Sequence, residues 1–228
     1  MGHGEIVGIA GVEGNGQKEL CEVVSGLAQP DSGSILFKGN DVTRWRVRRR
    51  LDAGMGYVPQ DRRGAGLILP FTVMENLALG WSDAPPLSRG GLLDPAAIRA
   101  RGERLMEVYD IRAEGPDALA STLSGGNQQK VVLAREFSRS PAFLLISQPT
   151  RGLDVGAIEY IYRRILELRE EGAAILLVSM ELDELFALSD RISVLQRGEV
   201  VFESAASATN ETEVGAHMIG GRVERSAS

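Results

Sequence analysis

Residues 123–130 read LSGGNQQK. A serine and two glycines precede a helix-compatible segment that ends before Pro141, since proline interrupts a helix. This stretch therefore predicts a helix over residues 126–139 with Ser124 at its N-terminal turn. The hydroxyl and the bare backbone N–H groups at such a turn can bind a phosphate group. A lone Ser-Gly-Gly is more often a flexible turn, so its weight depends on the motifs around it.

Residues 143–154 read FLLISQPTRGLD. The apolar run at the start of this segment is typical of a buried strand, and Asp154 is predicted to cap the next helix. Elsewhere, continuous apolar strands also alternate with helices, which predicts an α/β protein with a mostly parallel sheet covered on both faces. The predicted strands are 5–10, 34–38, 55–59, 143–147 and 173–179, the helices 18–27, 72–79, 95–109, 126–139, 155–171 and 181–188, and the hairpin 191–203.

Composition narrows the function classes. The 228 residues carry a formal net charge of -6, which argues against a nucleic-acid binder. The arginine-rich run Arg44–Arg50 is predicted to be the solvated start of a short helix, with Trp45 packed inward. A single cysteine, Cys21, and the lack of a signal peptide or a long apolar segment predict a cytoplasmic chain that reaches a membrane only through a partner.

Residues 11–18 read GVEGNGQK and lie between a predicted strand and helix, where a phosphate-binding loop of the form GxxxxGK[ST] belongs. The loop keeps backbone N–H groups that can surround an anion. Gln17 stands where the phosphate-binding lysine belongs, and Lys18 stands where a hydroxyl would bind Mg²⁺. Lys18 could replace the lysine only by bending its long side chain back. The predicted nucleotide-binding residues are Gly11, Gly14, Asn15, Gly16, Gln17, Lys18 and Gln60.

The groups that ATP hydrolysis needs are altered together. Hydrolysis requires a carboxylate that holds a metal ion, a group that acts on water and a polar residue that contacts the γ-phosphate. In the nucleotide-hydrolysing family that these motifs resemble, two acids end the apolar strand and a histidine follows the next strand. The resemblance implies that Ser147 and Gln148 stand in place of the acids and Met180 in place of the histidine. The only histidines, His3 and His217, lie far from these motifs in the sequence. We therefore predict no catalytic residue and no metal ligand of the chain's own.

Taken together, these motifs resemble the ATP-binding cassettes of ATP-binding cassette (ABC) transporters. The segments GVEGNGQ, YVPQDRRG and SQPTRGLDVGA, which begin at Gly11, Tyr57 and Ser147, resemble the second cassette of importers for nucleosides and simple sugars. The resemblance implies that Gln60 belongs to the Q-loop, Asp154 to the D-loop, and that the signature motif binds ATP, with its Mg²⁺, held by an opposing cassette. The signature residues are Leu123, Ser124, Gly125, Gly126, Asn127 and Gln128.

The same resemblance implies a P-loop (RecA-like) fold with an inserted helical signature subdomain. Residues 1–60 and 141–206 would form the core, 61–140 the subdomain and 207–228 a C-terminal tail. Family members have further strands before the phosphate loop, so the chain is expected to be an N-terminally truncated piece of a two-cassette polypeptide. Its expected partners are that second cassette, a transmembrane permease on whose cytoplasmic side it would lie and, indirectly, a substrate-binding protein, but no nucleic acid.

Three hypotheses remain open. The first is a catalytically degenerate cassette that supplies its signature motif to another cassette and couples to a permease. The second is a self-sufficient ATPase that uses Lys18 in place of the missing lysine. The third is an interaction module outside transport that has lost its nucleotide function. The substrate is bound by other subunits, so the sequence favours a nucleoside over a ribose-type sugar only weakly.

Overall fold

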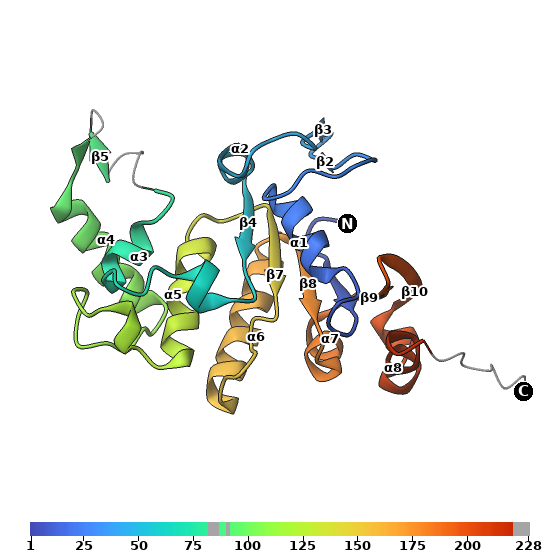
Figure 1. The fold of residues 1–228 in the computed structure, drawn as a ribbon. Coiled ribbons are helices and arrows are strands. Elements are labelled where there is room, and N and C mark those ends of the chain that lie inside the picture. Colours follow the sequence, from blue (N-terminus) through green and yellow to red (C-terminus); the bar gives the residue numbers. More distant parts are fainter. Residues whose placement is uncertain (82–86, 90–91, 221–228) are drawn as a thin grey trace, which may run out of the picture. The chain divides into compact units, whose positions relative to one another are not determined.

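The computed structural model describes residues 1–81, 87–89 and 92–220, and the chain divides into two units. The core unit comprises Met1–Tyr57, Pro141–Gln148 and Tyr162–Ser228. The signature unit comprises Val58–Ser140 and Pro149–Ile161. Figure 1 labels most elements of both units and colours the chain from blue at the N-terminus to red at the C-terminus.

The core unit is built on a six-stranded sheet in the order β10-β9-β1-β8-β7-β4 (Figure 1). Strand β1 pairs in parallel with β8 and β9, and β7 pairs in parallel with β8, whereas β10 runs antiparallel to β9. The prediction of a mostly parallel sheet is therefore confirmed. The strands are β1 (Ile6–Ala10), β4 (Met55–Val58), β7 (Phe143–Ser147), β8 (Ala174–Ser179), β9 (Arg191–Gln196) and β10 (Glu199–Ala205).

Both faces of the sheet are buried. Side chains of successive residues along β1 point to opposite sides, so β1 shows what covers each face. On one face Val7 and Ile9 pack in a cluster with Cys21 of helix α1 (Gln17–Ser25). On the other face Gly8 lies so close to α7 (Leu182–Leu188) that a Cβ atom there would be 2.8 Å from Leu185 Cδ2. The continuous apolar strands thus mark a sheet covered by helices on both sides. Helix α6 (Val155–Glu170) follows β7, with Ile161, Ile165 and Leu168 buried as predicted.

The remaining pieces of the core unit are small. Strands β2 (Leu36–Phe37) and β3 (Asn40–Asp41) form a separate two-stranded sheet, so the strand predicted over residues 34–38 is only two residues long. Helix α8 (Glu211–Met218) follows a short 3-10 turn, Ala206–Ala208, and packs against β9 and β10. Its Val214 and Met218 are buried, so the segment predicted to be a C-terminal tail contains a packed helix.

The arginine-rich run differs from its prediction. Trp45 is half-buried and lies under the Arg49 guanidinium, 3.9 Å away, at the start of α2 (Val47–Asp52). Arg50, predicted to be solvated, is only 1% exposed. Its guanidinium donates to the backbone carbonyls of Val23, Val24, Thr43 and Trp45 at 2.7–3.0 Å.

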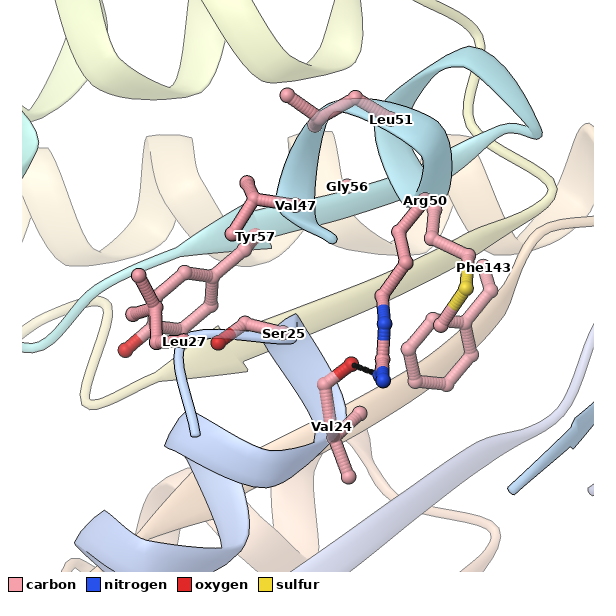
Figure 2. Close-up of a pocket in the computed structure, with 10 residues that line it drawn as sticks. Val24, Ser25, Leu27, Val47, Arg50, Leu51, Gly56, Tyr57 and Phe143 are labelled. Atoms are coloured by element: carbon pink, nitrogen blue, oxygen red, sulfur yellow. Dashed lines mark hydrogen bonds between the residues drawn. The ribbon is translucent and has the colours of Figure 1, made fainter. Parts of the chain in front are cut away.

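These contacts give Arg50 a structural role. Figure 2 shows its side chain reaching from α2 to the Val24 carbonyl at the end of α1, beside a small, mostly apolar pocket of about 50 Å³. The last carbonyls of a helix have no partner within the helix and carry partial negative charge. The guanidinium supplies hydrogen-bond donors to these carbonyls and a positive charge beside them. Burial lowers the pKa of Arg50 from its ordinary value.

The signature unit is mainly helical. Its helices are α3 (Val73–Ala78), α4 (Pro95–Val108) and α5 (Gly125–Phe137), with a π-helical turn at Arg62–Gly66, a 3-10 turn at Ala120–Thr122 and the start of α6. Thr72 and Glu75 form a capping box that begins α3. Helix α5 is largely buried and begins at Gly125, close to the predicted start.

The segment 82–91 is predicted from its sequence to be an exposed loop, and its residues 82–86 and 90–91 lie outside the described part of the chain. Strands β5 (Ser88–Arg89) and β6 (Leu92–Leu93) form a short antiparallel pair there. Leu87 and Ser88 are 1% and 5% exposed, so the exposed-loop prediction is wrong for these two residues. Within the described ranges, no helix combines the length and the apolar character needed to cross a membrane.

Candidate functional site

The loop between β1 and α1 is held by backbone contacts to the turn between β9 and β10. Gly14 and Gly16 have φ values of 87° and 104°, a conformation that favours glycine. Asn15 accepts the N–H of Arg197 on its side chain, at 3.2 Å, and the N–H of Gly198 on its carbonyl, at 2.9 Å. A Cβ atom on Gly16 would lie 3.2 Å from the Cα of Gly198, so this close approach requires the glycine.

The two residues that come after the loop are both engaged within the chain. Gln17 Nε2 donates to the carbonyl of Val12 at 2.9 Å, which folds the amide back across the loop against Gly11. The Lys18 side chain is 81% exposed and its Nζ lies 3.8 Å from Glu22 Oε1, one turn further along α1. The only cation at the start of this helix is therefore directed along the helix surface toward a carboxylate.

Ser147, Gln148 and Met180 lie at the ends of the two neighbouring strands β7 and β8. Ser147 is 4% exposed and hydrogen-bonds the thiol of Cys21 in α1. Burial raises the pKa of Cys21 to about 11, with the Ser147 contact opposing that change. Gln148 has a φ of 45° and donates its backbone N–H to Val178, and Met180 is half-buried. None of the three can supply a carboxylate or an imidazole, and no His, Cys, Asp and Glu cluster among the described residues could hold a metal ion.

In the signature unit, Ser124 is exposed and caps the N-terminus of α5. Its Oγ accepts the Asn127 side-chain amide at 3.0 Å and the Asn127 backbone N–H at 3.4 Å. Asn127 is fixed in turn, because its Oδ1 accepts the backbone N–H of Arg112 at 2.8 Å. A hydroxyl has two acceptor lone pairs and one proton, so Ser124 keeps its O–H for a partner outside this turn.

The remaining signature residues pack locally. A Cβ atom on Gly125 would lie 2.9 Å from Arg62 Nη2 and 3.6 Å from Leu153 Cδ2. A Cβ atom on Gly126 would lie 3.3 Å from the Cβ of Ala157. The two glycines therefore admit close neighbours in their own unit, a reason for glycine that the sequence did not indicate. Leu123 is half-buried, and Gln128 is buried with its amide donating to the Ala120 carbonyl at 3.0 Å.

Gln60 and Asp154 also belong to the signature unit. Gln60 is exposed and lies just beyond β4, and the next residue, Asp61, caps the π-helical turn by accepting the N–H groups of Arg63 and Gly64. Asp154 accepts the N–H of Ala157 at 2.9 Å and so begins α6, as predicted. Sequence reasoning missed Arg62, which contacts Gly125 from 63 positions away in the sequence. It lies inside the segment YVPQDRRG, but nothing local indicates its neighbour.

Comparison with known proteins identifies the family. A family model described as "ABC transporter" matches residues 1–151 of the chain. This chain belongs to the ABC transporter family. It is an ABC cassette in fold as well: a solved dimeric structure of MJ0796, a bacterial ABC transporter cassette, superposes with a TM-score of 0.75 at 25% identity, covering 90% of this chain and 86% of that one.

Curated relatives of this ABC cassette are longer proteins. It is 48% identical over 220 residues to the nucleoside import ATP-binding protein NupA of Lactococcus lactis, covering 96% of this chain and 44% of that protein. It is 46% identical to the glucose import ATP-binding protein TsgD13 of Haloferax volcanii, and the match covers 96% of this chain and 40% of that protein. It is 39% identical to the ribose import ATP-binding protein RbsA 2 of Rubrobacter xylanophilus, and the match covers 96% of this chain and 42% of that protein. The chain thus spans less than half the length of these relatives.

Proposed function

We propose that this cassette is the catalytically degenerate ATP-binding half of an importer. It supplies Ser124, Gly125 and Gly126 to ATP bound by a second cassette and couples that site to a permease through the Gln60 segment. The second cassette is the other half of the same polypeptide, and the pair lies on the cytoplasmic side of the membrane. ATP and its Mg²⁺ belong to the partner's site.

One observation carries this proposal, the asymmetry between the two phosphate-binding elements. At the loop, the Gln17 amide is bonded to Val12 and Lys18 is directed toward Glu22. At the signature turn, the Ser124 hydroxyl accepts two hydrogen bonds and keeps its proton to donate. An exposed donor at the positive end of a 13-residue helix suits an anion that another molecule presents.

The imported substrate is a nucleoside or a simple sugar. The relatives support this class, since their names include nucleoside, guanosine, glucose and ribose import. The substrate itself is bound by the permease and by a substrate-binding protein, so the cassette contributes energy rather than selectivity. The self-sufficient ATPase remains the alternative, and the exposed Lys18–Glu22 pair disfavours it because Lys18 would have to leave that pair and turn back.

Turnover measurements test the proposal. We expect the purified chain alone to hydrolyse Mg·ATP at background rate, because no carboxylate replaces Ser147 or Gln148 and no imidazole replaces Met180. Addition of the paired cassette and the permease should restore hydrolysis, and Ser124→Ala should then reduce it. Robust Mg²⁺-dependent turnover by the chain alone, abolished by Gln148→Ala, would contradict the proposal. Normal turnover by the Ser124→Ala complex would also contradict it.

Partial repair of the loop should raise affinity before activity. We expect Gln17→Lys combined with Lys18→Ser to strengthen Mg·ATP binding by about tenfold or more, since a lysine beside the β and γ phosphates adds a charge pair worth on the order of 4 kcal/mol at a near-surface effective dielectric. Turnover should stay at background until Ser147→Asp, Gln148→Glu and Met180→His are added. Calorimetric titration measures the affinity, with Lys18→Ser alone as the control. Equal affinities for the double variant and the control would show that this loop is not the nucleotide site.

A further inference from the structure

Arg62 lies against the signature turn within its own unit. It is the first residue of the π-helical turn Arg62–Gly66 that Asp61 caps. Its Nη1 donates to the carbonyl of Arg151 at 3.0 Å, and its Nη2 lies where it would be 2.9 Å from a Cβ atom on Gly125. The guanidinium is therefore held between the backbone before the D-loop and the first residue of α5.

The charge of Arg62 has no counter-ion in the described part of the chain. Salt bridges there join Arg99, Arg135 and Arg191 to carboxylates, whereas none reaches Arg62. Its Nε is buried without a hydrogen-bond partner, and Nη1 is the only one of its nitrogens with a hydrogen bond to a described residue. The N-terminal end of α5 adds positive potential at the same place. Two positive elements side by side attract an anion to this place.

We propose that Arg62 is a phosphate-binding residue of the signature site, presenting its Nη2 edge beside Ser124 to the γ-phosphate of the opposing cassette's ATP. This proposal rests on the proposed function of the cassette. The Arg151 carbonyl accepts one N–H of the guanidinium and so restricts its position, which reduces the side-chain freedom that is lost when phosphate binds. A guanidinium N–H bonded to phosphate forms one of the stronger hydrogen bonds in proteins. Gly125 is glycine partly because any side chain would displace this cation.

Variants that remove or keep the positive charge of Arg62 test this role in the assembled two-cassette transporter. We expect Arg62→Gln, which keeps a polar side chain but is shorter and carries no charge, to lower kcat/KM for ATP about tenfold or more through loss of a charge-assisted hydrogen bond. Arg62→Lys should show a smaller loss, because lysine keeps the positive charge but lacks the planar set of N–H donors of a guanidinium. Arg63→Gln is the matched control: Arg63 is the next residue and is exposed, and its substitution should leave kcat/KM within about twofold. The melting temperatures of the three variants should stay close to that of the parent.

The outcomes separate this inference from the proposed function. If Ser124→Ala impairs hydrolysis while Arg62→Gln does not, the signature function stands and the role of Arg62 is overturned. If Arg62→Gln and Arg62→Lys lose activity equally and both lower the melting temperature, Arg62 is structural and the inference also fails. If neither Ser124→Ala nor Arg62→Gln has an effect, both proposals fail. A loss in Arg62→Gln, recovered in part by lysine at unchanged stability, supports the inference.

Discussion

Hydrolysis of ATP by the assembled two-cassette transporter is expected to fall by about a hundredfold or more when Gly125 is changed to Asp. The new carboxylate would lie at the turn that, under the proposed function, contacts the γ-phosphate of the opposing cassette's ATP. Two like charges about 4 Å apart repel by on the order of 4 kcal/mol at a near-surface dielectric, and each 1.4 kcal/mol is about a factor of ten in rate. Substrate uptake, which hydrolysis drives, should fall with it.

The structure adds a second reason for this effect. A Cβ atom at position 125 would lie 2.9 Å from Arg62 Nη2, so the Asp carboxylate would also pair with Arg62 and neutralise it. The contact is with the far end of a flexible side chain, which can move, so the fold should tolerate the change. Gly125→Asp therefore introduces a negative charge at this turn and also occupies the N–H groups of Arg62 that would otherwise be offered to phosphate.

Matched controls separate charge from bulk. Gly125→Asn has nearly the same volume without the charge, and we expect it to retain several times more hydrolysis than Gly125→Asp. Gln148→Ala changes the residue that we propose stands in place of a catalytic acid, and it should leave hydrolysis within about twofold of the parent. Expression and membrane assembly must be equal for all three variants. If Gln148→Ala is the most damaging of them, this cassette hydrolyses ATP itself and the degenerate-site proposal fails.

Arg50→Met is expected to lower the free energy of unfolding by about 3 kcal/mol. The side chain is 1% exposed and bonds four backbone carbonyls, two of them at the end of α1. Methionine fills similar space but donates no hydrogen bond, and a buried acceptor left without a partner costs about 1–3 kcal/mol. The Val23 carbonyl keeps the N–H of Gly26 at 3.2 Å, so the loss falls mainly on the other three part-buried carbonyls. Removal of a desolvated charge offsets part of that cost. Domains are commonly stable by only about 5–15 kcal/mol, so the change is large.

Urea denaturation measured by circular dichroism tests this effect. Arg48→Met is the matched control, since Arg48 lies in the same helix with a side chain that is 49% exposed and pairs with Asp52 on the surface. That variant should lose no more than about 0.5 kcal/mol. Arg50→Lys should fall between the two, because lysine keeps the charge but cannot donate in the planar arrangement of arginine. Equal midpoints for Arg50→Met and Arg48→Met would show that the four bonds contribute nothing.

Arg50 also illustrates a limit of prediction from sequence. The run Arg44–Arg50 holds five arginines, a pattern that is typical of a solvated surface. Nothing in that run indicates that the last arginine meets the carbonyls of Val23 and Val24, from 27 and 26 positions away. The error has a physical cause. A guanidinium is buried where unpaired carbonyls converge, and that convergence exists only after α1 and α2 have packed.

By itself, the sequence determined the order of strands and helices, the parallel sheet and the family. Apolar runs, turn residues and caps act over a few neighbouring residues, so β7, α6 and the cap of Asp154 could be predicted from local pattern. The prediction that Gln17, Ser147, Gln148 and Met180 occupy altered motif positions was also made at this level, because motif spacing identifies a position without coordinates. Only the tertiary structure decided how those side chains are used.

The tertiary structure directed Lys18 toward Glu22, folded the Gln17 amide onto Val12 and left the Ser124 hydroxyl with a proton to donate. It also brought Arg62 against Gly125, residues that are 63 positions apart in the chain. The physical reason is the short distance over which these interactions act. Hydrogen-bond partners and counter-ions are fixed by distances of about 3–4 Å in space, and separation along the chain does not determine those distances once the elements pack.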